Sequence, residues 1–336
     1  MSETTDFDVL QQGAALVPRV GRCVVRVSGT ERASWLQGLL TNDVQALAPG
    51  QGCYAAWLTP QGRMITDAVV LAEDDTLTID VPVTLGELVY RQLGAAIFAE
   101  DVQLADEGAL WAMVGVHGPT AAANISRAMV GTEPSATRLT AEAMMGWPEY
   151  ANAPLGSAGR VMRLDHYGTP GFVIRVPAEA RDVWLSRLRL AGATPIAAEV
   201  VEFARVEAGR PEFLVDMDAD TIPLEAGIED RAISFTKGCY VGQEVIVRVV
   251  YRGGGRVARK LVGLKLESSA VPGARATVRS ERGEVGRVTS AAWSPRLRRT
   301  VAMAYVHRKF VEPGTALTVD CEGTLVPAVV SAFPIR

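Results

Sequence analysis

One thiol stands in a segment whose residue types could do chemistry. Residues 236–244, TKGCYVGQE, place Cys239 among two glycines, a lysine and an acid. If a helix begins near Val241, the exposed backbone N–H groups at its N-terminus and the charge of Lys237 would stabilise the thiolate of Cys239. Cysteines more usually serve as small buried apolar residues. On these residues alone, a reactive thiol and an inert one are equally open interpretations.

A second unusual residue is a glutamate near the end of a predicted helix. Residues 200–209, VVEFARVEAG, predict a helix that stops at Gly209. Glu207 falls in its last turn, where the helix dipole disfavours a carboxylate. Such a position is typical either of a residue kept for contact with a ligand or of a solvent-exposed glutamate, and the spacing does not separate the two.

The remaining metal-binding residue types do not form a recognisable ligand set. No two cysteines have the C-x-x-C spacing of a zinc or redox site, and the histidines are scattered singly. We therefore expect no structural metal centre, and in a reducing compartment we expect free thiols. The residues concerned are Cys23, Cys53, Cys239, Cys321, His117, His166 and His307.

Strands and helices alternate along the first 200 residues in hairpin-then-helix groups. This order predicts an α+β protein with ferredoxin-like lobes rather than a doubly wound sheet. Strands are predicted for residues 15–30, for three runs within 53–82, for 109–118 and for a hairpin over 160–177. Helices are predicted within 28–44, 84–98, 118–129 and 178–192.

The chain changes character after residue 250. Residues 232–235, AISF, predict a strand, whereas 242–249, GQEVIVRV, combine helix-favouring and strand-favouring residues and leave the element open. The segment 251–256, YRGGGR, is typical of a hinge. From Arg259 onward, short strands separated by Gly and Pro predict a small antiparallel barrel or sandwich.

Composition sets broad limits on function. The chain has 336 residues, of which 48% are hydrophobic, and a formal net charge of −4, so it predicts a globular protein of two or three domains and not a general nucleic-acid binder. Two basic clusters, within 252–265 and 296–299, are expected to be solvated faces. Residues 1–13 lack the pattern of a signal peptide, and no apolar run approaches the ~20 residues of a membrane span. We therefore expect a cytoplasmic protein.

Several segments together resemble one known family. ISFTKGCYVGQE, with RVEAGRP upstream and IPLEAG between them, is similar to the signature of the YgfZ-type folate-binding proteins, relatives of the glycine-cleavage aminomethyltransferase (T-protein). Residues 28–70 resemble the opening of the family, and 283–306 resemble the last domain of T-protein. The resemblance implies a T-protein-like three-lobed fold, with two ferredoxin-like lobes in residues 1–250 and a C-terminal β-barrel in 256–336, around a channel for a reduced folate.

The resemblance also assigns roles to individual residues. Glu207 matches the glutamate that recognises the pterin ring, and a carboxylate can accept two hydrogen bonds from the N–H edge of a pterin. Asp67 matches an acid near the reacting folate nitrogens, although it could also be a simple strand-edge aspartate. The resemblance implies further folate contacts at Lys237, Tyr240, Gln243 and Arg248.

The thiol separates this chain from T-protein, which has no such cysteine segment. The YgfZ-type resemblance therefore implies a tetrahydrofolate-binding accessory protein that uses Cys239 to support iron–sulfur cluster assembly or repair, and the tRNA modification that depends on it. Its partners would be iron–sulfur enzymes or cluster-assembly proteins. One cysteine cannot by itself hold a stable cluster. The alternative is a folate-dependent one-carbon transferase or demethylase with Asp67 as its acid. Direct binding of tRNA would rest on the basic clusters, and the net charge argues against it.

Overall fold

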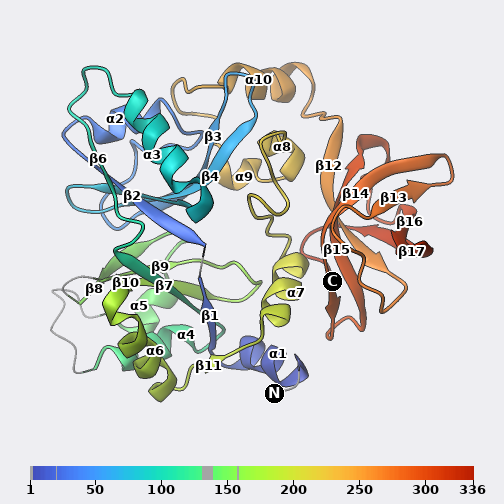
Figure 1. Ribbon diagram of the computed structural model, residues 1–336, viewed down its shortest axis with the longest axis horizontal. Coiled ribbons are helices and arrows are strands. Elements are labelled where there is room, and N and C mark those ends of the chain that lie inside the picture. The colour runs from blue at the N-terminus through green and yellow to red at the C-terminus, as the bar shows by residue number, and fades with distance from the viewer. Residues whose placement is uncertain (1–2, 20, 131–138, 157–158) are drawn as a thin grey trace.

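Two sheets and a barrel make up the fold of the computed structural model, which describes residues 3–19, 21–130, 139–156 and 159–336 (Figure 1). This confirms the predicted α+β class and its T-protein-like arrangement of two α/β lobes and a C-terminal barrel. Among the described residues, no helix is long and apolar enough to span a bilayer.

The first sheet has five strands in the order β3-β4-β5-β2-β6, and helices α2 and α3 cover it. Trp35 and Leu36 of α2 and Val89 and Leu93 of α3 pack on its buried strands. The bounds are β2 (Arg22–Ser28), α2 (Arg32–Gln37), β3 (Gly52–Leu58), β4 (Met64–Ala72), β5 (Leu77–Pro82), α3 (Gly86–Ala95) and β6 (Gln103–Asp106). The three strands predicted within 53–82 are thus confirmed.

The second sheet has six strands in the order β11-β1-β7-β10-β9-β8. Its core combines apolar residues of the strands with those of α4, α5 and α6. The bounds are β1 (Ala15–Pro18), β7 (Trp111–His117), α4 (Ala121–Ala128), α5 (Ala141–Met145), β8 (Asn152–Leu155), β9 (Gly159–Arg163), β10 (Gly171–Pro177), α6 (Arg181–Leu190) and β11 (Thr194–Pro195).

The C-terminal part is a closed barrel in the order β12-β15-β14-β13-β16-β17. Every neighbouring pair is antiparallel, so the predicted small antiparallel barrel is confirmed. Alternate residues of each strand point inward and fill the interior. The bounds are β12 (Arg259–Leu266), β13 (Thr277–Ser280), β14 (Gly283–Ser294), β15 (Arg299–His307), β16 (Ala316–Cys321) and β17 (Thr324–Ser331).

Helices and loops join the three parts. Helix α7 lies between the second sheet and the barrel, and α8, α9 and α10 follow it along the side of the first lobe (Figure 1). The bounds are α1 (Glu3–Gln12), α7 (Ala198–Ala208), α8 (Pro223–Ala226), α9 (Glu229–Ala232) and α10 (Gln243–Val247), the last continuing as a π-helix over Arg248–Arg252. The element left open over 242–249 is therefore helical.

Two strand predictions were wrong in instructive ways. Residues 15–30 form two strands, β1 and β2, that belong to different sheets, so the chain crosses from one lobe to the other just before Arg22. Residues 232–235 form no strand. Their backbone bonds to the first lobe instead: the Thr41 hydroxyl donates to the carbonyl of Ala232 (2.6 Å), and the Ser234 N–H donates to the carbonyl of Thr41 (3.1 Å).

Candidate functional site

A cavity of about 650 Å³ lies at the point where β1 passes into β2. Both sheets contribute to its wall, together with α7, α9 and the segment after α7. Apolar and aromatic side chains make up much of the lining, together with several acidic and basic side chains and one histidine. The acidic, basic and histidine residues of the lining are Arg19, Arg22, Asp67, His166, Glu202, Arg205, Glu212 and Arg231.

Asp67 is a buried carboxylate in this wall. It lies in β4, is only 6% exposed, and accepts hydrogen bonds at both oxygens. Arg22 Nη1 lies 3.0 Å from Asp67 Oδ1, and the Tyr54 hydroxyl lies 3.1 Å from Oδ2. Arg22 is itself fixed by Asp80 on the next strand, at 2.5 Å. Burial and the nearby Asp67 raise the pKa of Tyr54 well above its usual value. The Tyr54 hydroxyl therefore stays protonated and donates a hydrogen bond to Asp67.

Aromatic rings form another part of the wall. Tyr54 and Tyr150 are stacked, with ring centroids 6.4 Å apart and an interplanar angle of 14°. The guanidinium of Arg231, from α9, lies over the Tyr54 ring at 5.1 Å. Phe213 adds a third ring. Walls of this kind suit a flat, partly aromatic ligand.

A histidine and a glutamate lie elsewhere in the same lining. His166 Nε2 is 3.4 Å from Glu212 Oε1, and Tyr167 packs edge-on against His166. Burial lowers the pKa of His166 to about 4, so the ring is neutral at pH 7. Burial opposes the charge of Glu212, but the nearby His166 and the charge of Arg205 outweigh it and lower the pKa of Glu212 to about 2. The cavity thus contains an ionised carboxylate beside a neutral imidazole.

Glu207, by contrast, points away from the cavity and toward the barrel. Its carboxylate accepts hydrogen bonds from the Ser294 hydroxyl and from Arg296, whose Nε and Nη2 lie 3.0 and 2.9 Å from Oε2. Its backbone carbonyl accepts a bond from the N–H of Ile335 at 2.7 Å. In this structure, the acid near the end of α7 joins that helix to the barrel.

Lys237 also serves a neighbouring element. Its Nζ donates to the carbonyls of Gln37, Leu40 and Asn42 at 2.6, 2.6 and 2.9 Å, at and after the end of α2. Burial lowers the pKa of Lys237 to about 8, so at neutral pH it remains largely protonated and can make all three bonds. These bonds hold the loop of residues 236–242 against the first lobe.

Cys239 is exposed in that loop and does not line the cavity. The helix that follows it begins at Gln243, three residues beyond Tyr240 and later than expected. Tyr240 is buried in the core beneath the loop, with Lys237 Nζ 5.1 Å from its ring centroid. Gln243 is half-buried, and Arg248 is exposed and paired with Glu244 at 2.8 Å. Among the seven residues expected at the site, Asp67 alone lines the cavity.

Other lining residues carried little signal in the sequence. Arg22 stands out as a charge within an apolar strand, and Glu202 shares a helix with Glu207. Successive helical residues are rotated by about 100°, so positions five apart differ by roughly 140° and face different neighbours. Helical periodicity could show that Glu202 and Glu207 lie on different faces of the helix, but it could not show which of the two faces the cavity. Tyr54, Glu212 and Arg231 had no sequence pattern that pointed to a site.

Known proteins match this chain over nearly its whole length. The GCVT N-terminal domain matches residues 10–237, and the glycine cleavage T-protein C-terminal barrel domain matches 259–335. An aminomethyltransferase of Nostoc sp. is 30% identical over 340 residues, covering 98% of this chain and 87% of that protein. An aminomethyltransferase of Bordetella petrii is also 30% identical, covering 92% and 81%.

A solved structure has the same fold. The glycine cleavage system aminomethyltransferase T from Bartonella henselae superimposes with a TM-score of 0.87 at 19% identity, covering 99% of this chain and 89% of that one. Sequence and fold agree across both lobes and the barrel. The chain therefore belongs to the glycine cleavage T-protein family, of which it carries both the N-terminal domain and the C-terminal barrel.

Proposed function

We propose that the central cavity binds a reduced folate and that the protein is a folate-dependent one-carbon transferase or demethylase. The observation that carries this proposal is Asp67, a buried carboxylate in the cavity wall with both oxygens held by Arg22 and Tyr54. The aminomethyltransferase relatives, which match this chain almost end to end, support the same reaction class.

The lining fits the chemical parts of a folate. The rings of Tyr54, Tyr150 and Phe213 suit its flat aromatic groups, and a carboxylate suits the N–H edge of its pterin. A bound tetrahydrofolate would supply the nitrogens that carry the one-carbon unit. Asp67 would accept or hold a proton beside them, and Arg22 would keep its carboxylate oriented.

Two glutamates that line the cavity are alternative candidates to Glu207 for binding the pterin. Glu202 and Glu212 line the cavity, whereas Glu207 lies outside its lining, with its carboxylate bonded to Ser294 and Arg296. We propose that Glu202 or Glu212 receives the pterin, so Glu202→Gln or Glu212→Gln should weaken folate binding more than Glu207→Gln. Titration of the three variants with tetrahydrofolate decides this, and a larger loss in Glu207→Gln would return the role to Glu207.

Turnover tests the reaction itself. Purified protein should demethylate a methylated amine in the presence of tetrahydrofolate. Asp67→Asn should lower kcat by roughly 10²- to 10⁴-fold while tetrahydrofolate still binds, because a general acid–base contribution is lost. An exposed acid, Asp182, is the matched control, and Asp182→Asn should retain full turnover. Full activity of Asp67→Asn would remove Asp67 from the reaction.

Cys239 supports a second candidate, the YgfZ-type accessory role. Its thiol is exposed and lies outside the cavity, in a loop that Lys237 holds in place. A thiol so placed meets a partner more readily than a ligand inside the cavity. We propose that in this role the protein binds tetrahydrofolate and presents Cys239 to iron–sulfur enzymes or cluster-assembly proteins. In a strain depleted of this protein, Cys239→Ser should fail to restore iron–sulfur enzyme activity and dependent tRNA modification. Full rescue by the serine variant would exclude the thiol.

A further inference from the structure

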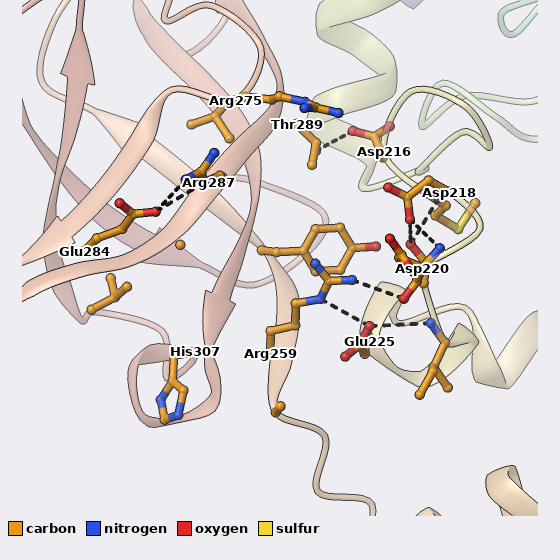
Figure 2. A pocket seen from close by; sticks show the side chains of 18 of the residues that line it. Asp216, Asp218, Asp220, Glu225, Arg259, Arg275, Glu284, Arg287, Thr289 and His307 are labelled. Carbon is orange, nitrogen blue, oxygen red and sulfur yellow. Dashed lines mark hydrogen bonds and ion pairs between the residues drawn. The ribbon is translucent and has the colours of Figure 1, made fainter. Parts of the chain in front are cut away.

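Carboxylates line two hollows of this protein, and most of them are engaged by cations of the chain. The larger hollow, of about 1560 Å³, lies between the barrel and residues 214–225. Figure 2 shows two ion pairs in its walls, Glu225 with Arg259 and Glu284 with Arg287, at 3.2 and 3.1 Å. Acids that are paired in this way have little charge left for a ligand.

The central cavity contains one carboxylate that differs from the others. Asp67 lies 3.0 Å from Arg22, and Glu202 lies 2.7 Å from Arg205. Glu212, in the segment after α7, has no lysine or arginine within ion-pair distance among the described residues. Its charge is therefore not matched by a cation of the chain.

The cations whose charges reach Glu212 are held by other acids. Arg19 Nη2 lies 3.6 Å from Asp80, and Arg205 Nη1 lies 2.5 Å from Asp216. The pKa of Glu212 is about 2, so its partly exposed carboxylate is ionised at neutral pH. An ionised carboxylate without a direct cation partner favours a cationic ligand.

His166 adds a second acceptor beside this carboxylate. It lies between β9 and β10 of the second sheet, and its Nε2 is 3.4 Å from Glu212 Oε1 with no hydrogen-bond partner. The ring is neutral at pH 7, and a neutral imidazole has one nitrogen that accepts a hydrogen bond. Tyr167 and Phe213, the next residues along the chain from His166 and Glu212, also line the cavity. The pair therefore combines one negative charge and two kinds of acceptor with aromatic neighbours.

We propose that Glu212 and His166 form the subsite for the protonated amine that donates the one-carbon unit. This rests on the one-carbon transfer to folate proposed above. A methylated ammonium would donate its N–H groups to Glu212 and His166 and rest its methyl groups against Tyr167 and Phe213. Glu212 then determines the charge of the donor, and Glu202 remains the cavity glutamate for the pterin.

The test measures the affinity for dimethylammonium chloride by NMR titration of its methyl signal at low salt. Glu212→Gln should weaken binding about fivefold, the value of one partly exposed ion pair, whereas Glu212→Asp should retain most of the affinity. His166→Phe keeps a flat ring but removes the acceptor and should weaken binding about threefold. The matched control is Glu199→Gln, at an exposed acid of α7 outside the lining, which should bind as the wild type does. Urea denaturation confirms that each variant is folded.

Two comparison ligands and a tetrahydrofolate titration complete the test. Tetramethylammonium, which has the charge but no N–H, should bind the wild type more weakly than dimethylammonium does, and neutral 2-propanol should bind more weakly still. Equal affinity of wild type and Glu212→Gln for dimethylammonium, or no binding to the wild type, would overturn the ammonium subsite. A loss of tetrahydrofolate affinity in Glu212→Gln with unchanged dimethylammonium affinity would also overturn it and would assign Glu212 to the pterin. If the wild type binds dimethylammonium through Glu212 but does not bind tetrahydrofolate, the subsite stands and the proposed folate function fails.

Discussion

The central cavity and the Cys239 loop hold their charged groups in opposite ways. In the cavity wall, Asp67 of β4 and Arg22 of β2 belong to one sheet, and Arg22 reaches across β5 to bond Asp67. In the loop, Lys237 Nζ donates three hydrogen bonds to carbonyls at and after the end of α2, and Cys239 remains exposed. The first arrangement orients charge toward an enclosed cavity, and the second exposes a thiol on the surface.

A sequence motif rich in reactive residue types therefore need not line the enclosed cavity. The residues of TKGCYVGQE with structural partners build the loop: Lys237 ties it down, and Tyr240 anchors it in the core. Preorganised groups aimed into a cavity contribute more to chemistry than exposed ones, because solvent screens the latter. Four variants test how far the two regions differ, in order of decreasing effect.

The largest effect is expected at the junction between cavity and barrel. Arg205 bonds both oxygens of the cavity residue Glu202, at 2.9 and 2.7 Å, and also reaches Asp216 and Ser290. Arg205→Met leaves the buried Asp216 without its cation and should lower the free energy of unfolding by about 3–5 kcal/mol. Urea denaturation measures it, with the exposed Arg189→Met as control. A loss similar to that of the control would show that the barrel does not brace the cavity wall.

Lys237 should come next. Lys237→Met removes three charge-assisted bonds and leaves their carbonyls to find water, so we expect a loss of roughly 1.5–3 kcal/mol. Folate binding should be unchanged, because Lys237 does not line the cavity. Denaturation combined with a tetrahydrofolate titration checks both statements. Weaker binding at unchanged stability would mean that Lys237 contacts the ligand after all.

Acid sensitivity should depend on a buried histidine behind the cavity. His117 is 2% exposed, and burial lowers its pKa to about 3. Between the usual histidine pKa and this value, the unfolded chain binds a proton that the folded chain does not, so stability falls as the pH falls below about 6.5. In His117→Gln, the loss between pH 7.5 and pH 5 should be smaller by about 2 kcal/mol. Equal losses in the two proteins would show that His117 is protonated in the folded state.

The smallest effect on stability is expected at the thiol. Cys239 is exposed, so Cys239→Ser should change the free energy of unfolding by less than about 0.5 kcal/mol. Tetrahydrofolate affinity should also be unaltered. Thermal unfolding and titration measure these quantities beside wild type. A marked loss of folate affinity would show that the loop of Cys239 takes part in folate binding, as the cavity is proposed to do.

Local pattern was enough for most of the fold. Short apolar runs separated by turn residues predicted the strands within 53–82 and those of the barrel, and pairs such as β3–β4, β4–β5 and β16–β17 join strands that follow one another in the chain. The strand predicted over 232–235 failed because its backbone groups bond to Thr41, far away in the chain. Similarly, nothing local indicated that the chain changes sheets between Pro18 and Arg22.

Sequence alone was enough to predict the T-protein-like superfamily, the α+β class with its C-terminal barrel, and Asp67 as a residue of interest. Tertiary structure decided which side chains share a cavity, because that depends on pairings between distant segments. Arg231 reaches Tyr54 from 177 positions further along the chain, by subtraction of their numbers. Helical period separates Glu202 from Glu207, but only the docking of α7 between lobe and barrel turns the first toward the cavity and the second toward Arg296.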